Sequence, residues 1–391
     1  MELTTPKKLP ASVGKWGMIL TAVGVIMGGA AFAVDPHRAF FGYLWMYMFL
    51  VSIGVGSLAL VALEYLVGAN WSTPFRRVPE FLAGIILLLV ILVIPLLFGM
   101  HDLFHWTHAE AVAEDPILKS KEPYLNTPFF IARTGVILLI WLIFYYLFTR
   151  NSRKQDISKD PALTTSSIKY SAIFAILFIL TISFTAIDWM MSLEPHWFST
   201  MFGVYYFAGT LVAAISISAF ISVSLNEGGY FGFKVDDEKY YSFGTLMFAF
   251  NVFWTYIGFS QYMLIWYADI PEETFWFMNR MEGTWVYFSI GLLFVHFIIP
   301  FLILLPRSSK VNPNLILYMS AWLIYAHAYD LYWIIMPTYF KDGFVFSWNE
   351  LGFLVLAFGI IALVFNYMAS KFNIVPVGDP KLQRGLYFHL N

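Results

Sequence analysis

Residues 40–68 read FFGYLWMYMFLVSIGVGSLALVALEYLVG, with Glu64 as the one charged side chain among them. A bilayer core is about 30 Å thick, and a helix that rises about 1.5 Å per residue crosses it with about 20 apolar residues. The run is therefore long enough to span a membrane. Its apolar residues are continuous instead of alternating, which indicates a helix and not a strand of a transmembrane barrel.

Similar runs occur along the rest of the chain. Of its 391 residues, 59% are hydrophobic and 12% are charged, whereas soluble domains are about half apolar and about a quarter charged. This excess predicts an all-α polytopic membrane protein with ten transmembrane helices, surrounded by lipid. The expected spans are 16–34, 40–68, 78–100, 128–149, 168–191, 198–225, 240–267, 284–305, 314–336 and 350–369.

Charge and cysteine content exclude several classes of function. The chain has 23 basic and 25 acidic residues, so it lacks the positive surplus that a nucleic-acid-binding protein needs, and we expect no nucleic-acid partner. It has no cysteine, which excludes disulfides, thiolate-bound iron-sulfur clusters and c-type haem. Histidine is then the remaining side chain able to ligate a haem iron.

Lysine and arginine positions predict the orientation, because positively charged connections stay in the cytoplasm. They gather at both termini and in the even-numbered connections, which predicts that both termini are cytoplasmic. The first span is expected to be an uncleaved helix, because its apolar run is longer than the core of a signal peptide and another span follows at once. The opposite face is acidic, which suits a basic soluble partner. The cytoplasmic set is Lys7, Lys8, Lys15, Arg76, Arg77, Arg150, Arg153, Lys154, Lys159, Lys234, Lys239, Arg307, Lys310, Lys371, Lys381 and Arg384.

One motif, A-x-D-x6-P-x-aromatic-F, occurs twice with a separation of 142 residues, at Ala186 to Phe198 and at Ala328 to Phe340. A second shift, of 161 residues, aligns the second span with the sixth. Together the two shifts predict parallel repeats of four helices, spans 2 to 5 and 6 to 9, with spans 1 and 10 at the periphery. The expected divisions are 1–39, 40–197, 198–340 and 341–391.

Ionisable residues within apolar spans need a partner or a function, because burying a charge in a membrane is costly. The fifth span carries Asp188, and Arg133 near the outer end of the fourth span is its expected counter-ion. The ninth span carries His327 and Asp330, three residues apart and so able to form a hydrogen bond. A structural ion pair is the alternative explanation for Arg133.

Further polar residues suggest a route for protons. Glu64 is the candidate cytoplasmic entrance, and a file of hydroxyl side chains leads from it toward the two aspartates. Those hydroxyls belong to Thr181, Thr185, Ser216, Ser218 and Ser222. The alternative is that these small residues let helices approach closely and bond to their own backbones.

Two groups of histidines raise the question of metal. His101, Asp102, His105 and His108 form a cluster at the outer end of the third span. His296 and His327 are deep in the eighth and ninth spans, where a bis-histidine haem is conceivable. Solvated surface and ordinary hydrogen bonding explain both groups more simply, so we expect no metal held by this chain.

Longer motifs resemble those of a known family. The stretches DWMMSLEPHWFSTMFG (188–203), FSQY (259–262) with PEE (271–273), and SAWLIYAHAYD (320–330) are similar to the large membrane subunits of alternative complex III, a bacterial quinol:cytochrome c oxidoreductase. Such subunits are similar to the NrfD and polysulfide-reductase membrane-anchor family, whose core is two four-helix bundles. The chain's length and its motif sequence at 188–197 resemble those of the smaller, second of the two paralogous membrane subunits.

The resemblance implies a function and a set of partners. It implies a subunit of a quinol-oxidising complex in the bacterial inner membrane, with menaquinol or ubiquinol as the substrate of the complex. The implied partners are a larger paralogous membrane subunit, iron-sulfur and cytochrome c subunits on the outer face that carry the iron-sulfur and haem groups, and a terminal oxidase. This chain would bind no cofactor itself and would support quinol oxidation with a proton path.

Three alternatives stay open from the sequence. In the first, the chain binds quinone in its own right, as a catalytic subunit. In the second, it is a secondary transporter, in which paired repeats enclose a substrate at the membrane midplane. In the third, it is a structural anchor whose polar residues only join helices.

Overall fold

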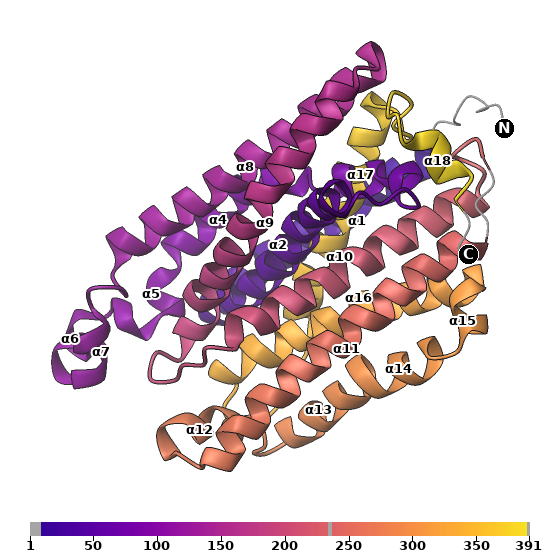
Figure 1. Cartoon of the computed structure of the whole chain (residues 1–391). Helices are drawn as coiled ribbons and strands as arrows, with labels where there is room; N and C mark the ends of the chain where they lie inside the picture. The colour runs from indigo at the N-terminus through magenta and orange to yellow at the C-terminus, as the bar shows by residue number, and fades with distance from the viewer. Residues whose placement is uncertain (1–8, 234–236, 389–391) are drawn as a thin grey trace.

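The computed structural model describes residues 9–233 and 237–388, in which the regular elements are helices (Figure 1). Lys7, Lys8 and Lys234, which enter the predicted orientation, lie outside these residues. The long helices are α1 (Ala11–Val34), α2 (Pro36–Val67), α8 (Thr127–Ser158), α9 (Pro161–Trp189), α10 (Phe202–Glu227), α11 (Asp237–Ala268), α16 (Pro313–Ile335) and α17 (Trp348–Lys371).

Two of the predicted spans are interrupted. The third consists of η1 (Thr73–Phe75), α3 (Arg77–Leu82), α4 (Ile85–Phe98) and α5 (Met100–Leu103), and the eighth of α13 (Trp285–Leu292), η4 (Leu293–Ile298) and α14 (Ile299–Leu304). The η4 segment is a π-helical turn. Pro300 explains it, because proline has no N–H for the carbonyl of His296 and its ring would collide with that carbonyl in an α-helix.

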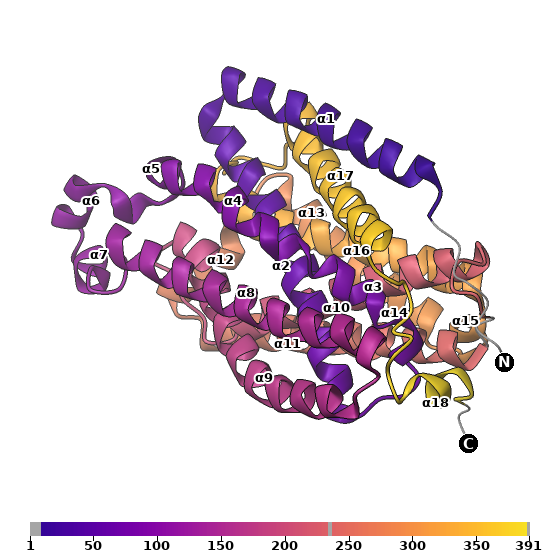
Figure 2. The same ribbon diagram turned by 90° about the horizontal axis from the view of Figure 1, so that it is seen from above.

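Short helices connect the long ones. They are η2 (His105–Thr107), α6 (Ala109–Glu114), α7 (Pro116–Lys121), η3 (Met191–Leu193), α12 (Pro271–Asn279), α15 (Arg307–Val311), η5 (Met336–Thr338) and α18 (Leu382–Leu386). In both views α6, α7 and α12 lie toward one end of the helix array, and α15 and α18 lie at the other (Figures 1 and 2). We name these the α12 end and the α18 end.

Eight segments are long and apolar enough to cross a membrane, judged by length and composition. They are Ala11–Val34, Pro36–Val67, Thr73–Phe98, Thr127–Ser158, Pro161–Leu193, Phe202–Glu227, Trp285–Leu304 and Trp348–Lys371. Helices α11 and α16 occupy the seventh and ninth predicted spans but are not among the eight. A multi-pass, all-helical membrane protein is therefore supported, whereas the count of ten spans stays a prediction.

Helices α2 and α10 lie at the centre of the array. Their most apolar windows are 89% and 83% buried, against 22% for α1. Helix α2 packs against α4, α9, α10, α16 and α17, and α10 packs against α2, α9, α11 and α16. Polar side chains on α2 and α10 are consequently shielded from lipid by the surrounding helices.

Helices α1 and α17 lie side by side at one edge of the molecule (Figure 2). Glycines allow their backbones to approach closely, as is common between membrane helices. A Cβ atom at Gly24 would lie 2.6 Å from Cα of Leu356, and one at Gly359 would lie 2.5 Å from the backbone nitrogen of Thr21. By contrast, a Cβ at Gly29 of α1 would meet nothing within 4 Å.

This difference gives a matched pair of substitutions on one helix. Gly24→Ala is expected to destabilise the protein by about 1–3 kcal/mol, because the added methyl group forces α1 away from α17. Gly29→Ala is expected to leave stability unchanged or to raise it slightly, since alanine favours a helix more than glycine does. Thermal unfolding of the two variants in detergent measures the difference, and equal melting temperatures would show that the close contact contributes nothing.

Candidate functional site

Asp188, near the end of α9, is buried and is bound by residues from the preceding helix and loop. Arg133 of α8 donates to both carboxylate oxygens, from Nε at 2.9 Å and from Nη2 at 3.0 Å. Tyr124 donates its hydroxyl to the same carboxylate at 2.9 Å, and its backbone oxygen accepts from Arg133. The ion pair predicted from the sequence is present, and its bidentate geometry is the strong form of an arginine–carboxylate contact.

Arg133 also packs against aromatic rings. Its guanidinium lies 3.9 Å from the ring centre of Tyr124 and 4.4 Å from that of Phe129. Such stacking favours arginine over lysine at this position. Asp188 therefore contacts a guanidinium that is itself packed in place by aromatic rings.

The hydroxyls of Thr181 and Thr185 on α9 form hydrogen bonds within the protein. Thr181 accepts a hydrogen bond from the indole nitrogen of Trp141 at 2.9 Å and donates to the backbone of its own helix. Thr185 donates to the carbonyl of Thr181 at 2.8 Å. These contacts match the alternative in which hydroxyls bond to their own backbone, and the structure does not join them to the candidate path.

Asp330, the residue that matches Asp188 in the repeat, has different partners. Tyr205 of α10 donates to one carboxylate oxygen at 2.5 Å, and the indole nitrogen of Trp254 of α11 donates to the other at 3.2 Å. Both partners are neutral, and Asp330 is 2% exposed. The two acids of the repeat thus differ in charge compensation, because a guanidinium faces one and two neutral donors face the other.

The hydrogen bond expected between His327 and Asp330 is replaced by other contacts. Nε2 of His327 lies 2.9 Å from the hydroxyl of Ser52 on α2, and both oxygens of Asp330 are occupied by other donors. Residues three apart on a helix are neighbours, but the packing of α2 and α10 decides which way each side chain turns.

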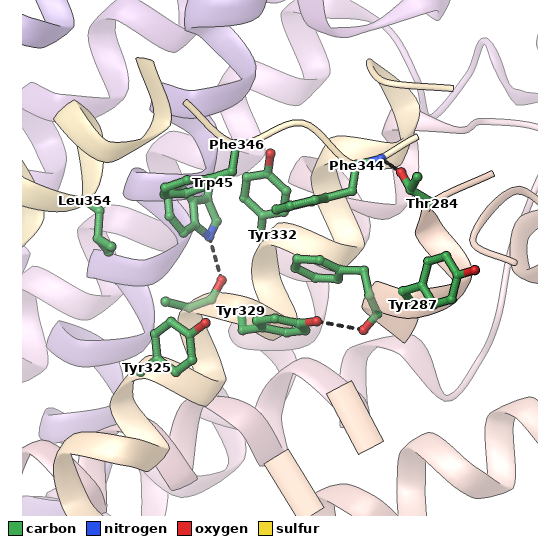
Figure 3. A pocket seen from close by; sticks show the side chains of 11 residues that line it. Trp45, Thr284, Tyr287, Tyr325, Tyr329, Tyr332, Phe344, Phe346 and Leu354 are labelled. Carbon is green, nitrogen blue, oxygen red and sulfur yellow. Dashed lines mark hydrogen bonds between the residues drawn. The ribbon is translucent and has the colours of Figure 1, made fainter. Parts of the chain in front are cut away.

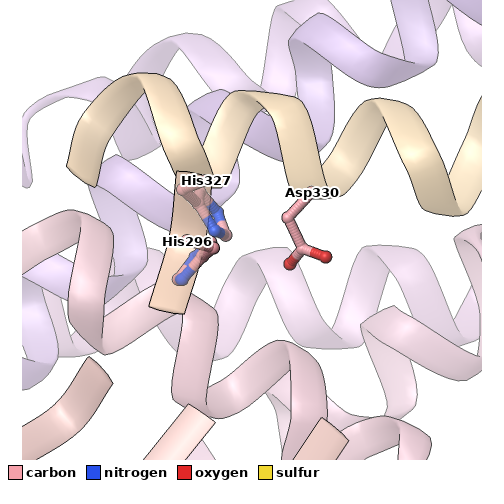
Figure 4. A group of neighbouring side chains, drawn as sticks. All are labelled: His296, His327 and Asp330. Atoms are coloured by element: carbon pink, nitrogen blue, oxygen red, sulfur yellow. The ribbon is translucent and has the colours of Figure 1, made fainter. Parts of the chain in front are cut away.

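His296 completes this buried group (Figure 4). Its Nδ1 lies 3.0 Å from the amide oxygen of Asn251 on α11, and its ring stacks on Trp254 with centres 3.6 Å apart. One possible ligand atom from each of His296, His327 and Asp330 lies within 4.8 Å of the others. Sequence alone placed the two histidines on neighbouring spans, but the π-helical turn that directs His296 inward became visible only in the fold.

Further hydroxyl groups lie on α2 and α10, between this group and the α18 end. Ser52 contacts Tyr206 and Thr210, and Gly56 packs directly against Thr210 and Ala214. The hydroxyls of a further set are buried and have no hydrogen-bond partner among the described residues. This set is Ser57, Ser216, Ser218 and Ser222. Buried polar groups without partners are rare and point to sites where water or an ion is accommodated.

Glu64 lies at the α18 end in a network of ion pairs. Arg76 bonds to Glu64 at 3.2 Å, to Glu80 at 3.3 Å and to Asp379 of the C-terminal segment at 2.6 Å. Arg77 bonds to Glu80 at 3.2 Å and to Asp156 at 2.6 Å. Sequence reasoning singled out Glu64 but missed this network, whose acids come from four separate segments of the chain.

The network also attaches residues 372–388 to the helices. Replacing Arg76 with glutamine is expected to free this segment, because Asp379 and Glu64 would both lose their buried counter-ion. Hydrogen–deuterium exchange of backbone amides in residues 372–388 should then speed up by at least about tenfold, whereas Lys371→Gln, at an exposed position, should leave it unchanged. Unchanged exchange in the Arg76→Gln variant would show that other contacts hold the segment.

A polar cavity of about 720 Å³ opens at the α12 end. The predicted cluster His101, Asp102, His105 and His108 lines it, and the fold adds His37 and His196, which the sequence did not connect with the cluster. His196 donates to the carboxylate of Asp115, and this hydrogen bond lowers the pKa of Asp115. In the described part of the chain these histidines do not form a compact group of three ligands.

Arg280, which lies between the seventh and eighth predicted spans, is buried at the α12 end and connects two segments there. It donates to the carbonyls of Trp333 and Ile334 at the end of α16 and lies 3.6 Å from Glu194 of the first repeat motif. Burial lowers the pKa of Arg280 to about 10. The arginine therefore joins the two repeat motifs and satisfies carbonyls at a helix end.

A second, aromatic cavity of about 530 Å³ lies beside α16 (Figure 3). Trp45, Phe288, Tyr329 and Tyr332 contribute its walls. Several of their polar atoms are occupied within the protein, since Trp45 donates to the carbonyl of Ala328 at 2.8 Å and Tyr329 to that of Phe288 at 2.8 Å. The cavity therefore presents mainly flat apolar surfaces.

Taken together, the described residues include two buried carboxylates in unlike settings, two buried imidazoles, and unpartnered hydroxyls on the two central helices. These groups can bind and pass protons. A scan against protein-family models and a search of curated proteins both give no match to this chain.

Proposed function

We propose that this chain is an integral membrane subunit of a respiratory quinol:cytochrome c oxidoreductase similar to alternative complex III. In this proposal partner subunits carry the electrons, and this chain supports quinol oxidation by providing a proton path. The observation that carries the proposal is Asp330, a buried carboxylate with two neutral partners that lies beside two buried imidazoles. A buried acid without a counter-ion is costly, which favours a functional reason for keeping it.

The proposed arrangement has ten spans in two parallel four-helix units, with α1 and α17 at the periphery. The first unit comprises α2, the α3–α4 segment, α8 and α9, and the second comprises α10, α11, the α13–α14 segment and α16. Packing of α2 with α4 and α9, of α8 with α4 and α9, and of α10 with α11 and α16 supports this division. The α18 end would face the cytoplasm of a bacterial cell, as the lysine and arginine pattern predicts.

The proposed path runs between α2 and α10. It begins at Glu64, continues along the unpartnered serine hydroxyls, and reaches Asp330 through Ser52 and His327. The ion pairs of Glu64 with Arg76 would close its cytoplasmic end at rest. Asp188, paired with Arg133, would serve as a second acceptor near the α12 end, where protons would leave beside the histidine-lined cavity.

Two alternatives are weighed by particular features. A transporter with a midplane substrate usually has matching breaks in its repeated helices. Here the interruptions fall at Ala83–Gly84 in the third span and at Leu293–Ile298 in the eighth, which are not equivalent under a four-helix repeat. A purely structural anchor explains the Asp188–Arg133 pair but does not explain why Asp330 is buried without a counter-ion.

Isolation of the native complex tests the proposal. Gentle solubilisation should recover this chain with a larger membrane paralogue and with subunits that contain iron-sulfur clusters and c-type haem, and the preparation should reduce cytochrome c with quinol. A haem spectrum from this chain alone would contradict the absence of a redox centre in it. Recovery of the chain without redox partners, together with uptake of a solute by liposomes containing it, would instead support the transporter alternative.

The aromatic cavity favours a second candidate function, in which the chain itself binds quinone. Flat aromatic walls suit a quinone ring and its apolar tail. Leu354→Trp, at the wall of the cavity, should then lower the quinone retained by the purified chain by at least about tenfold, or about 1.4 kcal/mol of binding. Leu351→Trp, an exposed position on the same helix, is the control, and equal quinone content in both variants would exclude this cavity.

A further inference from the structure

Two imidazole nitrogens in the buried group have no hydrogen-bond partner among the described residues. They are Nε2 of His296 and Nδ1 of His327, and both histidines are fully buried. Nδ1 of His327 faces Gly209, where a Cβ would lie 3.0 Å from it and 3.5 Å from the ring of Trp254. That same indole stacks on His296 and donates to Asp330, so the free nitrogen of His327 lies near a ring that contacts both other members of the group.

The other nitrogen of each ring has a partner that selects the tautomer. Nδ1 of His296 lies 3.0 Å from the amide oxygen of Asn251, which accepts a hydrogen. The hydroxyl of Ser52 donates to the carbonyl of Met48 or to Tyr206, so it accepts from Nε2 of His327. With these protons assigned, each free nitrogen carries a lone pair. Asp330 adds a carboxylate held by two donors, so three electron-pair donors meet at one place.

We propose that His296, His327 and Asp330 form a binding site for a divalent transition-metal ion, with Zn²⁺ as the best fit. Two neutral imidazoles and one carboxylate are a typical zinc donor set, which leaves a fourth position open. Zinc ligands lie about 2.0–2.2 Å from the metal, so atoms now within 4.8 Å of one another would draw together by about an ångström. Partners that orient each ligand from behind are the usual support of a metal site.

The hard cations Mg²⁺ and Ca²⁺ fit this site less well, because they prefer oxygen ligands and bind imidazole weakly. Bound Zn²⁺ would occupy the lone pairs that the proposed path uses. If the proposed function is right, which this consequence alone assumes, the metal would therefore inhibit proton transfer. Binding itself requires no assumption about quinol or protons.

Zinc content tests the site without any activity measurement. The complete protein is produced with and without added Zn²⁺, passed over a chelating column, and analysed for zinc per chain by mass spectrometry. We expect close to one tightly held zinc per chain, with X-ray absorption showing two imidazole ligands and oxygen at about 2.0–2.2 Å. His296→Gln should abolish this zinc, and Asn251→Ala, which removes only the support of His296, should weaken binding about 10–100-fold.

The histidine-lined cavity at the α12 end provides the matched control. The double variant His101→Gln/His108→Gln removes one exposed and one half-buried imidazole of that cavity and should leave the tightly held zinc unchanged. Zinc well below one per chain in the unaltered protein would overturn the proposal, as would loss of zinc in the double variant. If His296→Gln does not fold, the ligand count from X-ray absorption of the unaltered protein decides, and fewer than two imidazoles would contradict the site.

Discussion

Asp330→Asn is expected to slow quinol:cytochrome c turnover by about a hundredfold and to abolish proton release by the complex in liposomes. An asparagine cannot bind or release a proton, and a positioned acid or base contributes about 10²–10⁴-fold to a proton-transfer step. The substitution keeps the size of the side chain, and its amide oxygen can still accept from Tyr205 or Trp254. Turnover with cytochrome c and the pH change outside liposomes measure the two effects.

Two controls separate chemistry from folding. Glu110→Gln removes an exposed acid at the α12 end and should leave turnover unchanged. Asp330→Glu keeps the acid and should retain more activity than Asp330→Asn, whereas a merely structural carboxylate would give similar losses in both. Normal turnover and proton release in a folded Asp330→Asn variant would remove Asp330 from the proposed path.

Arg133→Gln is expected to destabilise the protein by about 3–5 kcal/mol, because it leaves the buried carboxylate of Asp188 without its counter-ion. Asp188 is 1% exposed and Arg133 is 11% exposed. The converse change, Asp188→Asn, should cost less, since the partly exposed guanidinium can turn toward the surface.

The double variant Arg133→Gln/Asp188→Asn should recover part of the stability lost in Arg133→Gln, since no unpaired charge remains. Denaturant unfolding of the four proteins in detergent gives the coupling between the two residues. A loss of unfolding free energy below about 1 kcal/mol in Arg133→Gln would be typical of an exposed salt bridge. It would mean that Asp188 reaches water.

The helices and the Arg133–Asp188 ion pair could be predicted from the sequence, because the patterns that indicate them are local. Continuous apolar runs mark helices such as α2, and Arg133 lies close to Asp188 because α8 and α9 are joined directly. Some of the ion pairs that sequence reasoning missed come from distant segments. Arg76 meets Asp379 across about three hundred residues of chain, and no periodic pattern links such positions.

The partners of Asp330 were not predictable for a related reason. His327 is its near neighbour on one helix, but Tyr205 and Trp254 reach it from α10 and α11 and occupy both oxygens. Which residue becomes the hydrogen-bond partner of Asp330 depends on how three helices pack. The spacing of residues along one helix does not determine that packing. Likewise, the inward direction of His296 depends on the π-helical turn before Pro300, and a proline within an apolar run does not by itself reveal which side chain the turn redirects.

The central claim is that Asp330 takes up and releases a proton when quinol is oxidised. Infrared difference spectra of the complex, recorded between its oxidised and quinol-reduced states, report protonation of individual carboxyl groups. We predict a carboxylic-acid C=O band that shifts in deuterated water and is missing from the Asp330→Asn variant. A spectrum in which every carboxyl band is the same in the unaltered complex and in Asp330→Asn would contradict the account.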